Sequence, residues 1–151
     1  MIYIRKAIPE DLSILLEFEQ GIIAAERPFD PTLKEGEISY YDLKKMITAH
    51  DVEVVVAELN DQIIGSGYAR IENAKSYLNH ELFAYLGFMY THPDHRGKGV
   101  NKQIIEALSN WIRSQGIFEM RLDVYNDNPS AIKAYEKVGF KKHLINMRLG
   151  I

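Results

Sequence analysis

Residues 91–101 read Thr91-His92-Pro93-Asp94-His95-Arg96-Gly97-Lys98-Gly99-Val100-Asn101 and join two regular elements of the expected fold. The apolar and aromatic segment before it, Leu82 to Tyr90, predicts a strand, and Gly87 inside that segment indicates a bulge or a close backbone approach. The segment after it places one apolar face on a helix that ends near Gln115-Gly116, with Val100, Ile104, Ile105, Leu108, Trp111 and Ile112 on that face. The chain therefore passes from strand to helix through a short turn rich in glycine and basic residues.

This turn has the composition of an anion-binding site. A glycine-rich turn that opens a helix offers backbone N–H groups and the positive end of the helix dipole, and Arg96 and Lys98 add charge. It is not a nucleotide-triphosphate loop, because Gly99 follows Lys98 where that loop needs Ser or Thr, and it is not a dinucleotide fingerprint, because its third glycine would be Lys102. The spacing alone leaves open a basic turn that only caps the helix.

A second informative stretch covers residues 122–140, Leu122-Asp123-Val124-Tyr125-Asn126-Asp127-Asn128-Pro129-Ser130-Ala131-Ile132-Lys133-Ala134-Tyr135-Glu136-Lys137-Val138-Gly139-Phe140. Residues 129–138 predict a helix with proline in its first turn. Ala131, Ala134, Tyr135 and Val138 share one face of that helix. Residue pattern alone favours Tyr135 as a core tyrosine whose hydroxyl lies at the rim.

The rest of the chain predicts further alternation of strands and helices. Strands are expected at residues 2–4, 52–56, 63–71, 120–124 and 140–149. Helices are expected from Pro9, with Leu12, Leu15 and Leu16 on one face, and over residues 40–49. A loop is expected over residues 21–36 and a polar turn over residues 73–79. No linker or repeat divides the chain. We therefore expect one domain, residues 1–151, of the mixed α/β (α+β) class with several antiparallel strands before a helix-rich half.

Composition excludes several function classes. The 151 residues carry 18 Lys plus Arg against 21 Asp plus Glu, a net charge of −3, which disfavours a nucleic-acid-binding domain. The absence of cysteine excludes thiolate metal sites and a cysteine nucleophile, and the five histidines form no HExxH-type pair, so no metal site is expected. No apolar run suggests a membrane span and residues 1–6 do not suggest a secretory signal, so we expect a cytoplasmic protein.

Together the two stretches resemble the GNAT superfamily of acetyl-CoA-dependent N-acetyltransferases. The family pattern Q/R-x-x-G-x-G/A is matched by Arg96, Gly99 and, imperfectly, Asn101. The later pattern is matched about 30 residues on by Asn128, Pro129, Ala131, Tyr135, Gly139 and Phe140. The resemblance implies the GNAT fold, with a mostly antiparallel central sheet and helices on both faces, over essentially the whole chain.

The resemblance also implies a role for each matched residue. The pyrophosphate of acetyl-CoA, the expected co-substrate, would lie on the turn formed by Arg96, Gly97, Lys98, Gly99, Val100 and Asn101. The pantetheine arm would pair with the splayed strand end at Met89 to Thr91 and accept or donate a hydrogen bond at Asn128. Tyr135 would protonate the departing thiolate, and a backbone N–H near Met89 would stabilise the oxyanion.

Two residues depart from the family pattern. Asn101 replaces a small residue where the backbone and the diphosphate approach each other, so we expect weakened or shifted coenzyme binding. Gly87 lies where many relatives carry a glutamate base, so the base must come from elsewhere or act through water. Glu72 and Glu81 are candidates for this role, although each also fits a solvated surface carboxylate.

The function expected from the sequence is acetyl transfer from acetyl-CoA to a primary amine by direct attack in a ternary complex, because no cysteine can carry an acetyl intermediate. The alternative is a non-catalytic acyl-CoA-binding sensor or interaction domain. In the region expected to bind the acceptor, Glu26 and Asp30 suit a cationic amine, whereas Arg27 and Pro28 suit a carboxylate-bearing one. A small-molecule or peptide amine is thus the expected partner. The short strand expected after Phe140 would leave a sheet edge that a homodimer could cover.

Overall fold

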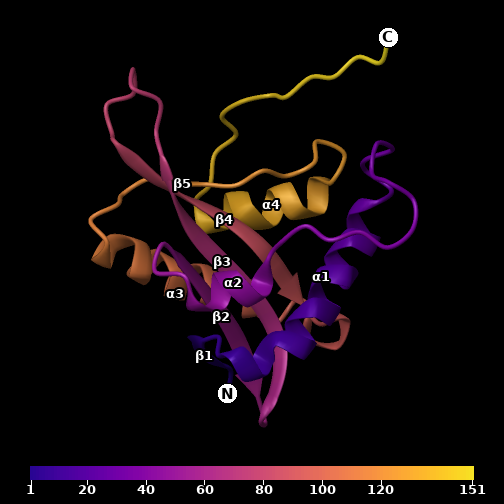
Figure 1. The fold of residues 1–151 in the computed structure, drawn as a ribbon, viewed down its shortest axis with the longest axis vertical. Helices are drawn as coiled ribbons and strands as arrows, with labels where there is room; N and C mark the ends of the chain where they lie inside the picture. The colour runs from indigo at the N-terminus through magenta and orange to yellow at the C-terminus, as the bar shows by residue number, and fades with distance from the viewer.

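The computed structural model describes all residues 1–151 as a twisted sheet with helices on both faces (Figure 1). The strands lie side by side in chain order: β1 (Tyr3–Lys6), β2 (Val52–Leu59), β3 (Gln62–Asn73), β4 (Leu82–Thr91) and β5 (Met120–Arg121). The helices are α1 (Leu12–Glu26), α2 (Leu43–Thr48), α3 (Val100–Ser114) and α4 (Pro129–Val138), with short 3₁₀ turns η1 (Pro9–Asp11) and η2 (Pro93–His95). Only the β4–β5 pair is parallel. The α+β class with a mostly antiparallel sheet is confirmed.

The sheet has one apolar core on each face. On one face α1 and α2 bury Leu15, Phe18, Leu43 and Ile47 against β2, β3 and β4. On the other face α3 buries Ile104, Ile105, Leu108 and Ile112. Helix α4 buries no residue fully and packs its partly buried Tyr135 and Val138 against the α3 core. None of these helices is long and apolar enough to cross a membrane.

Helix α1 continues past the point where the sequence predicted a loop. The loop expected to begin at Gly21 is wrong for its first residues, because the helix runs through Gly21 to Glu26. A Cβ atom at Gly21 would lie 2.8 Å from the ring of Tyr90, which stacks on Phe18 with 4.3 Å between ring centroids. The glycine is therefore where β4 packs closely against the helix, and it does not end the helix.

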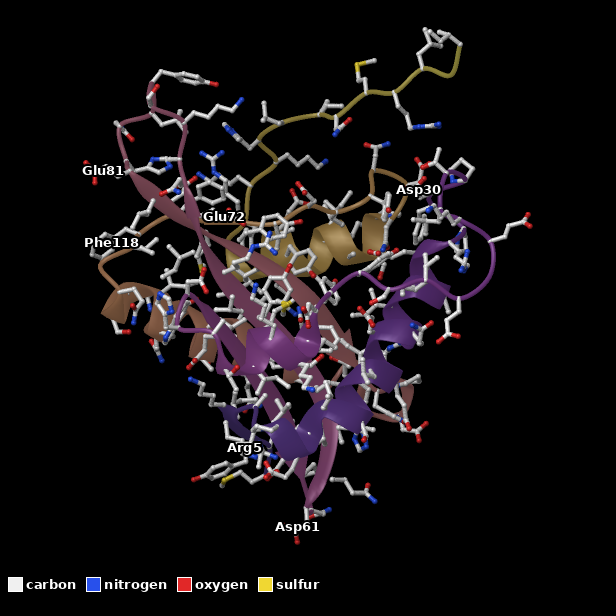
Figure 2. All side chains as sticks on the ribbon, in the orientation of Figure 1. Arg5, Asp30, Asp61, Glu72, Glu81 and Phe118 are labelled. Carbon is white, nitrogen blue, oxygen red and sulfur yellow. The ribbon has the colours of Figure 1, made fainter.

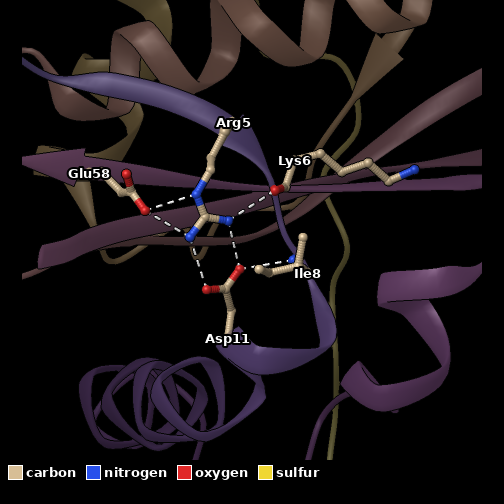
Figure 3. A network of polar contacts seen from close by, with 5 residues as sticks. All are labelled: Arg5, Lys6, Ile8, Asp11 and Glu58. Atoms are coloured by element: carbon tan, nitrogen blue, oxygen red, sulfur yellow. Dashed lines mark hydrogen bonds and ion pairs between the residues drawn. The ribbon is translucent and has the colours of Figure 1, made fainter. Parts of the chain in front are cut away.

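The start of α1 is tied to the sheet by one arginine (Figure 3). The Arg5 guanidinium of β1 donates to both carboxylate oxygens of Asp11, at 2.8 and 3.0 Å, and to Glu58 of β2 at 2.8 Å. Asp11 is only 6% exposed and also accepts the N–H of Ile8. Hydrogen bonds from Arg5 hold the pKa of the Asp11 carboxyl below its ordinary value. The network fixes the direction in which the chain leaves β1.

The end of the chain departs most from the sequence prediction. The strand expected over residues 140–149 does not form, and the strand expected over residues 120–124 is limited to β5. Leu144, Ile145, Met147 and Leu149 are each more than 80% exposed, and Figure 1 shows the tail running away from the body. Adjacent apolar residues 144 and 145 interrupt the alternation of a half-buried strand, and the two-residue β5 offers almost no edge to pair with. The strand edge that a homodimer was expected to cover is therefore absent, and the homodimer itself stays a prediction.

The Arg5 network predicts a specific effect of Asp11→Asn. Removing the carboxylate leaves Arg5 with one acidic partner, so the free energy of unfolding should fall by about 2–3 kcal/mol. Because the folded-state pKa of Asp11 is lowered, its contribution is present above the unfolded pKa of about 3.9 and is lost as the pH falls below it. Urea unfolding at pH 7 and pH 3 measures both effects. The difference between wild type and variant should shrink at pH 3, whereas Glu10→Gln, an exposed neighbour, should change little at either pH.

Candidate functional site

A bulge in β4 shapes the centre of the molecule. The β3–β4 register shifts between Ser66 and Tyr68, and Phe88 adopts a left-handed backbone conformation with φ of 56°. The Ser66 hydroxyl donates to the Phe88 carbonyl at 3.0 Å, and both residues are buried. The bulge increases the local twist and turns the following residues of β4 relative to the preceding ones.

Gly87 is required at this bulge by a close approach. A Cβ atom at residue 87 would lie 2.5 Å from Cζ and from the hydroxyl oxygen of Tyr68. The Tyr68 ring thus fills the space that a side chain at residue 87 would need, so the prediction of a bulge or close approach at Gly87 is confirmed. A carboxylate cannot occupy this position without displacing the buried tyrosine.

Beyond the bulge, β4 has an open edge. Its parallel pairing with β5 consists of Ala84 with Met120 and Tyr85 with Arg121, and β4 continues alone to Thr91 on that side. On the opposite side, the N–H of His92 donates to the carbonyl of Ile64 in β3, at 2.7 Å. Because successive residues of a strand point their backbone groups to opposite sides, the N–H groups of Thr91 and Met89 face the open edge.

The open edge leads into the glycine-rich turn and α3. Gly97 and Gly99 have φ of 76° and 81°, a left-handed conformation that glycine adopts without strain. Gly99 is the N-cap of α3, and no side chain caps the helix. The first N–H groups of the helix, those of Val100, Asn101 and Lys102, are therefore left without an intrahelical partner. This geometry offers three backbone donors and the helix dipole to one anion.

The two cationic side chains of the turn, Arg96 and Lys98, form hydrogen bonds with backbone carbonyls of the same loop. Arg96 Nε donates to the Thr91 carbonyl at 3.2 Å, and Lys98 Nζ donates to the Asp94 carbonyl at 3.3 Å. Both side chains are exposed and neither is paired with a carboxylate. Their charge stays available at the surface of the turn.

Helix α4 brings Asn128 and Tyr135 to the α3 side of the sheet. The Asn128 side-chain oxygen caps the helix by accepting the N–H of Ala131 at 3.2 Å, which leaves its amide nitrogen free to donate. The Tyr135 ring packs edge-on against Phe140, with 5.8 Å between ring centroids, and against the core that contains Ala84 and Leu86 of β4.

The Tyr135 hydroxyl is a protonated and unpartnered group. Burial, and to a smaller extent the charge of Glu26, raises the pKa of Tyr135 to about 12. No hydrogen bond holds the hydroxyl. It therefore carries its proton at neutral pH, as a group that protonates a departing thiolate must.

The two carboxylates expected to serve as a base lie apart from this open edge. Glu72 is on β3 opposite Phe83 and is ion-paired with Arg70. Glu81 is exposed, directly before the first residue of β4, beside the end of α3. Figure 2 shows Glu81 near Phe118, on the other side of the view from Asp30. Since β4 rises about 3.3 Å per residue, Glu81 lies roughly 26 Å along the chain from Met89.

The structure instead brings a different carboxylate towards Tyr135. Glu26, at the end of α1, lies close enough for its charge to raise the pKa of Tyr135. Burial, and then the nearby charges of Glu26 and Asp30, raise the pKa values of Tyr40 and Tyr125. The sequence predicted Glu26 and Asp30 in the acceptor region, as groups that suit a cationic amine. It gave no sign of Tyr40 and Tyr125, because no local spacing marks residues that meet through the fold.

Comparison with known proteins places these features in context. The profile of the acetyltransferase (GNAT) family matches residues 20–140. An acetyltransferase of Pectobacterium atrosepticum is 32% identical over 93 residues, which are 61% of this chain and 60% of that protein. The chain thus spans about 60% of the length of this relative, and only 19% of the length of an uncharacterized N-acetyltransferase of Bacillus subtilis that is 40% identical over 47 residues.

Solved structures resemble the whole fold. A tetramutant of the BH1408 protein from Bacillus halodurans superposes with a TM-score of 0.87 at 16% identity, covering 99% of both chains. A predicted acetyltransferase from Clostridium acetobutylicum, solved with acetyl-CoA, superposes with a TM-score of 0.69 at 23% identity, covering 99% of this chain and 96% of the other. At these identities the likeness concerns the fold.

Proposed function

Because the chain belongs to the acetyltransferase (GNAT) family, we propose that it transfers an acetyl group from acetyl-CoA to a primary amine by direct attack in a ternary complex. The observation that carries the proposal is the open edge of β4, which leads into an uncapped, glycine-rich helix start on the side where α4 holds a protonated tyrosine. An acyl donor with a polar arm and a diphosphate needs these features together.

The donor side of the site fits coenzyme A. The free N–H groups of Val100, Asn101 and Lys102 suit the pyrophosphate, and Arg96 and Lys98 add two exposed cations. The outward backbone groups of Met89 and Thr91 suit the amide groups of the pantetheine arm, as a strand would pair with them. The free amide nitrogen of Asn128 supplies one more donor. Asn101, partly buried, is the residue expected to crowd the diphosphate.

In the proposed reaction the neutral amine nitrogen attacks the thioester carbonyl, so a C–N bond forms and the C–S bond breaks. The Met89 N–H stabilises the negative charge that develops on the carbonyl oxygen. Tyr135 gives its proton to the departing sulfur and is reprotonated from solvent. The nitrogen loses one proton to a base, which residue 87 cannot supply because Tyr68 fills that space.

Gly99→Val tests the donor site. A β-branched residue is strained at a φ of 81° and places a side chain where the diphosphate is expected. Acetyl-CoA at 100 times its dissociation constant should stabilise wild type by about 2.7 kcal/mol and raise Tm by several degrees. The variant should lose most of this shift in a thermal melt. Gly116→Val, at a φ of 74° beyond the far end of α3, should lower Tm without acetyl-CoA to a similar degree yet keep the shift.

Tyr135→Phe tests the proton donor. The substitution keeps the ring on Phe140 and removes a hydroxyl that has no hydrogen-bond partner, so stability should change little. Release of CoA thiol in the presence of an amine panel should fall by roughly 10²–10⁴-fold, with acetyl-CoA affinity near that of wild type. Tyr77→Phe, at an exposed tyrosine, is the matched control.

If Tyr135→Phe released CoA thiol at a rate within threefold of wild type, water or another residue would protonate the sulfur. Binding of acetyl-CoA without thiol release for any amine, in wild type as well, would instead support a non-catalytic acyl-CoA-binding domain.

A further inference from the structure

One arginine on β3 has hydrogen-bond donors that the protein itself does not use. Arg70 lies opposite Tyr85 of β4, and its guanidinium carbon is 5.4 Å from the ring centroid of Tyr85 and 5.7 Å from that of Tyr68. Tyr68 belongs to the core under α1 and α2, and Tyr85 packs against that core. Figure 1 shows β3 and β4 continuing beyond α2 towards their hairpin. With 40% of its side chain exposed, Arg70 lies at the border of the covered part of this face.

Arg5 shows how this protein uses a complete guanidinium (Figure 3). The Arg5 Nε donates to Glu58, and its two terminal nitrogens donate to the two carboxylate oxygens of Asp11. Arg70 repeats the first half of this arrangement, because its Nε donates to Glu72 at 2.5 Å. Neither terminal nitrogen of Arg70 donates to a carboxylate or a carbonyl. The planar fork that binds Asp11 in Arg5 is therefore open in Arg70, and such a fork suits a carboxylate bound through two parallel hydrogen bonds.

The neighbours of Arg70 hold its guanidinium in one orientation. The Tyr85 hydroxyl donates to Asp123 at 3.0 Å, and Tyr68 is only 2% exposed, so both rings that contact the guanidinium are held in place. The bond to Glu72 fixes the Nε edge. A binding group that is fixed before its ligand arrives loses little conformational freedom on binding. The open fork of Arg70 is therefore preorganised.

The open fork lies near the place where the proposed reaction occurs. Tyr68 lies opposite Gly87 and its ring covers that glycine, so the same tyrosine contacts both the bulge and Arg70. Along β4, Gly87 is two residues from Tyr85, which is about 7 Å. The hydrogen bonds between a guanidinium and a carboxylate take about 3 Å of this distance. The remainder matches an amine that is one or two carbon atoms from a carboxylate.

Two other arginines fit this role less well. Arg27, which the sequence offered for a carboxylate, donates instead to two carbonyls of its own loop. Arg121 on β5 resembles Arg70, because its Nε donates to Glu119 at 3.1 Å. Its guanidinium, however, lies over Phe83, with 5.1 Å from the guanidinium carbon to the ring centroid. Phe83 is four residues before Gly87, so Arg121 lies towards the hairpin and away from the bulge.

We propose that Arg70 selects an amino acid as the acetyl acceptor, with its terminal nitrogens binding the carboxylate while the amine nitrogen lies at the bulge of β4. The neutral nitrogen forms the new C–N bond as the C–S bond breaks, the sulfur takes the proton of Tyr135, and the nitrogen loses one proton to water. The identity of the acceptor rests on the proposed acetyl transfer, whereas the binding of a carboxylate by Arg70 is a property of the site alone.

Calorimetric titration tests the carboxylate site without relying on turnover. The probes are glycine and L-phenylalanine, each compared with its own amide, glycinamide or L-phenylalaninamide, in protein saturated with CoA. Wild type should bind each amino acid about tenfold more tightly than its amide, because a bidentate charge-assisted contact is lost in the amide. Arg70→Gln should remove this difference, and Arg70→Lys, which keeps the charge without the fork, should restore only part of it.

Arg121→Gln is the matched control, because it removes an arginine with the same kind of ion pair on the neighbouring strand. This variant should keep the preference for the amino acid. Equal affinities within each pair in wild type, or a preference that survives Arg70→Gln, would overturn the proposal. Loss of the preference in Arg121→Gln with its retention in Arg70→Gln would equally overturn the assignment to Arg70.

Turnover then tests the acceptor class. With acetyl-CoA and the tighter-binding amino acid, Arg70→Gln should raise KM about tenfold and change kcat less than threefold, because the carboxylate contact is present in both the ground state and the transition state. If no amine releases thiol in wild type, the proposed function fails and the calorimetric result still decides whether Arg70 binds a carboxylate. If amino acid and amide react with equal kcat/KM, acetyl transfer stands and the selection by Arg70 fails.

Discussion

Strand β4 has a partner on its second edge only as far as Tyr85, and the rest of the site depends on this loss of pairing. Two features accompany it: the left-handed Phe88 and the Tyr68 ring packed over Gly87. Beyond them the backbone groups of Met89 and Thr91 face an open edge. An extended polar ligand can replace the missing strand there, which is how a sheet recognises a chain of amide groups.

The early end of the β4–β5 pairing also explains the placement of the helices. Because β5 ends after two residues, the chain is free to cross to Asn128 and begin α4. Helix α4 stays half-buried and brings Tyr135 to the core beneath β4, while Tyr125 reaches the end of α1. On the other side of the open edge, Gly97 and Gly99 start α3 without a capping side chain. In the proposed function, these features surround the unpaired part of β4.

Several of these features could be predicted from short stretches of the sequence. The turn at residues 96–101 needs glycine for its positive φ angles, Asn128 is a helix cap, and α3 has one continuous apolar face, so each is visible in a short stretch of sequence. Gly21 was misread because a helix glycine required by the Tyr90 ring looks like a loop glycine. The tail was misread because a strand forms only where a neighbouring edge exists. Asp30 and Tyr125 are joined by a hydrogen bond across 95 residues of chain, so their proximity needed the structure.

In the proposed function, the open edge of β4 and the start of α3 together hold the acyl donor. Amide hydrogen exchange with and without acetyl-CoA measures this directly, residue by residue. We expect slower exchange at Met89, Thr91, Val100 and Asn101 when acetyl-CoA is added. Val55, which is paired on both sides in the centre of the sheet, should show no change. Protection that spares β4 and the turn, and appears instead at the opposite end near Glu81 and Phe118, would contradict it.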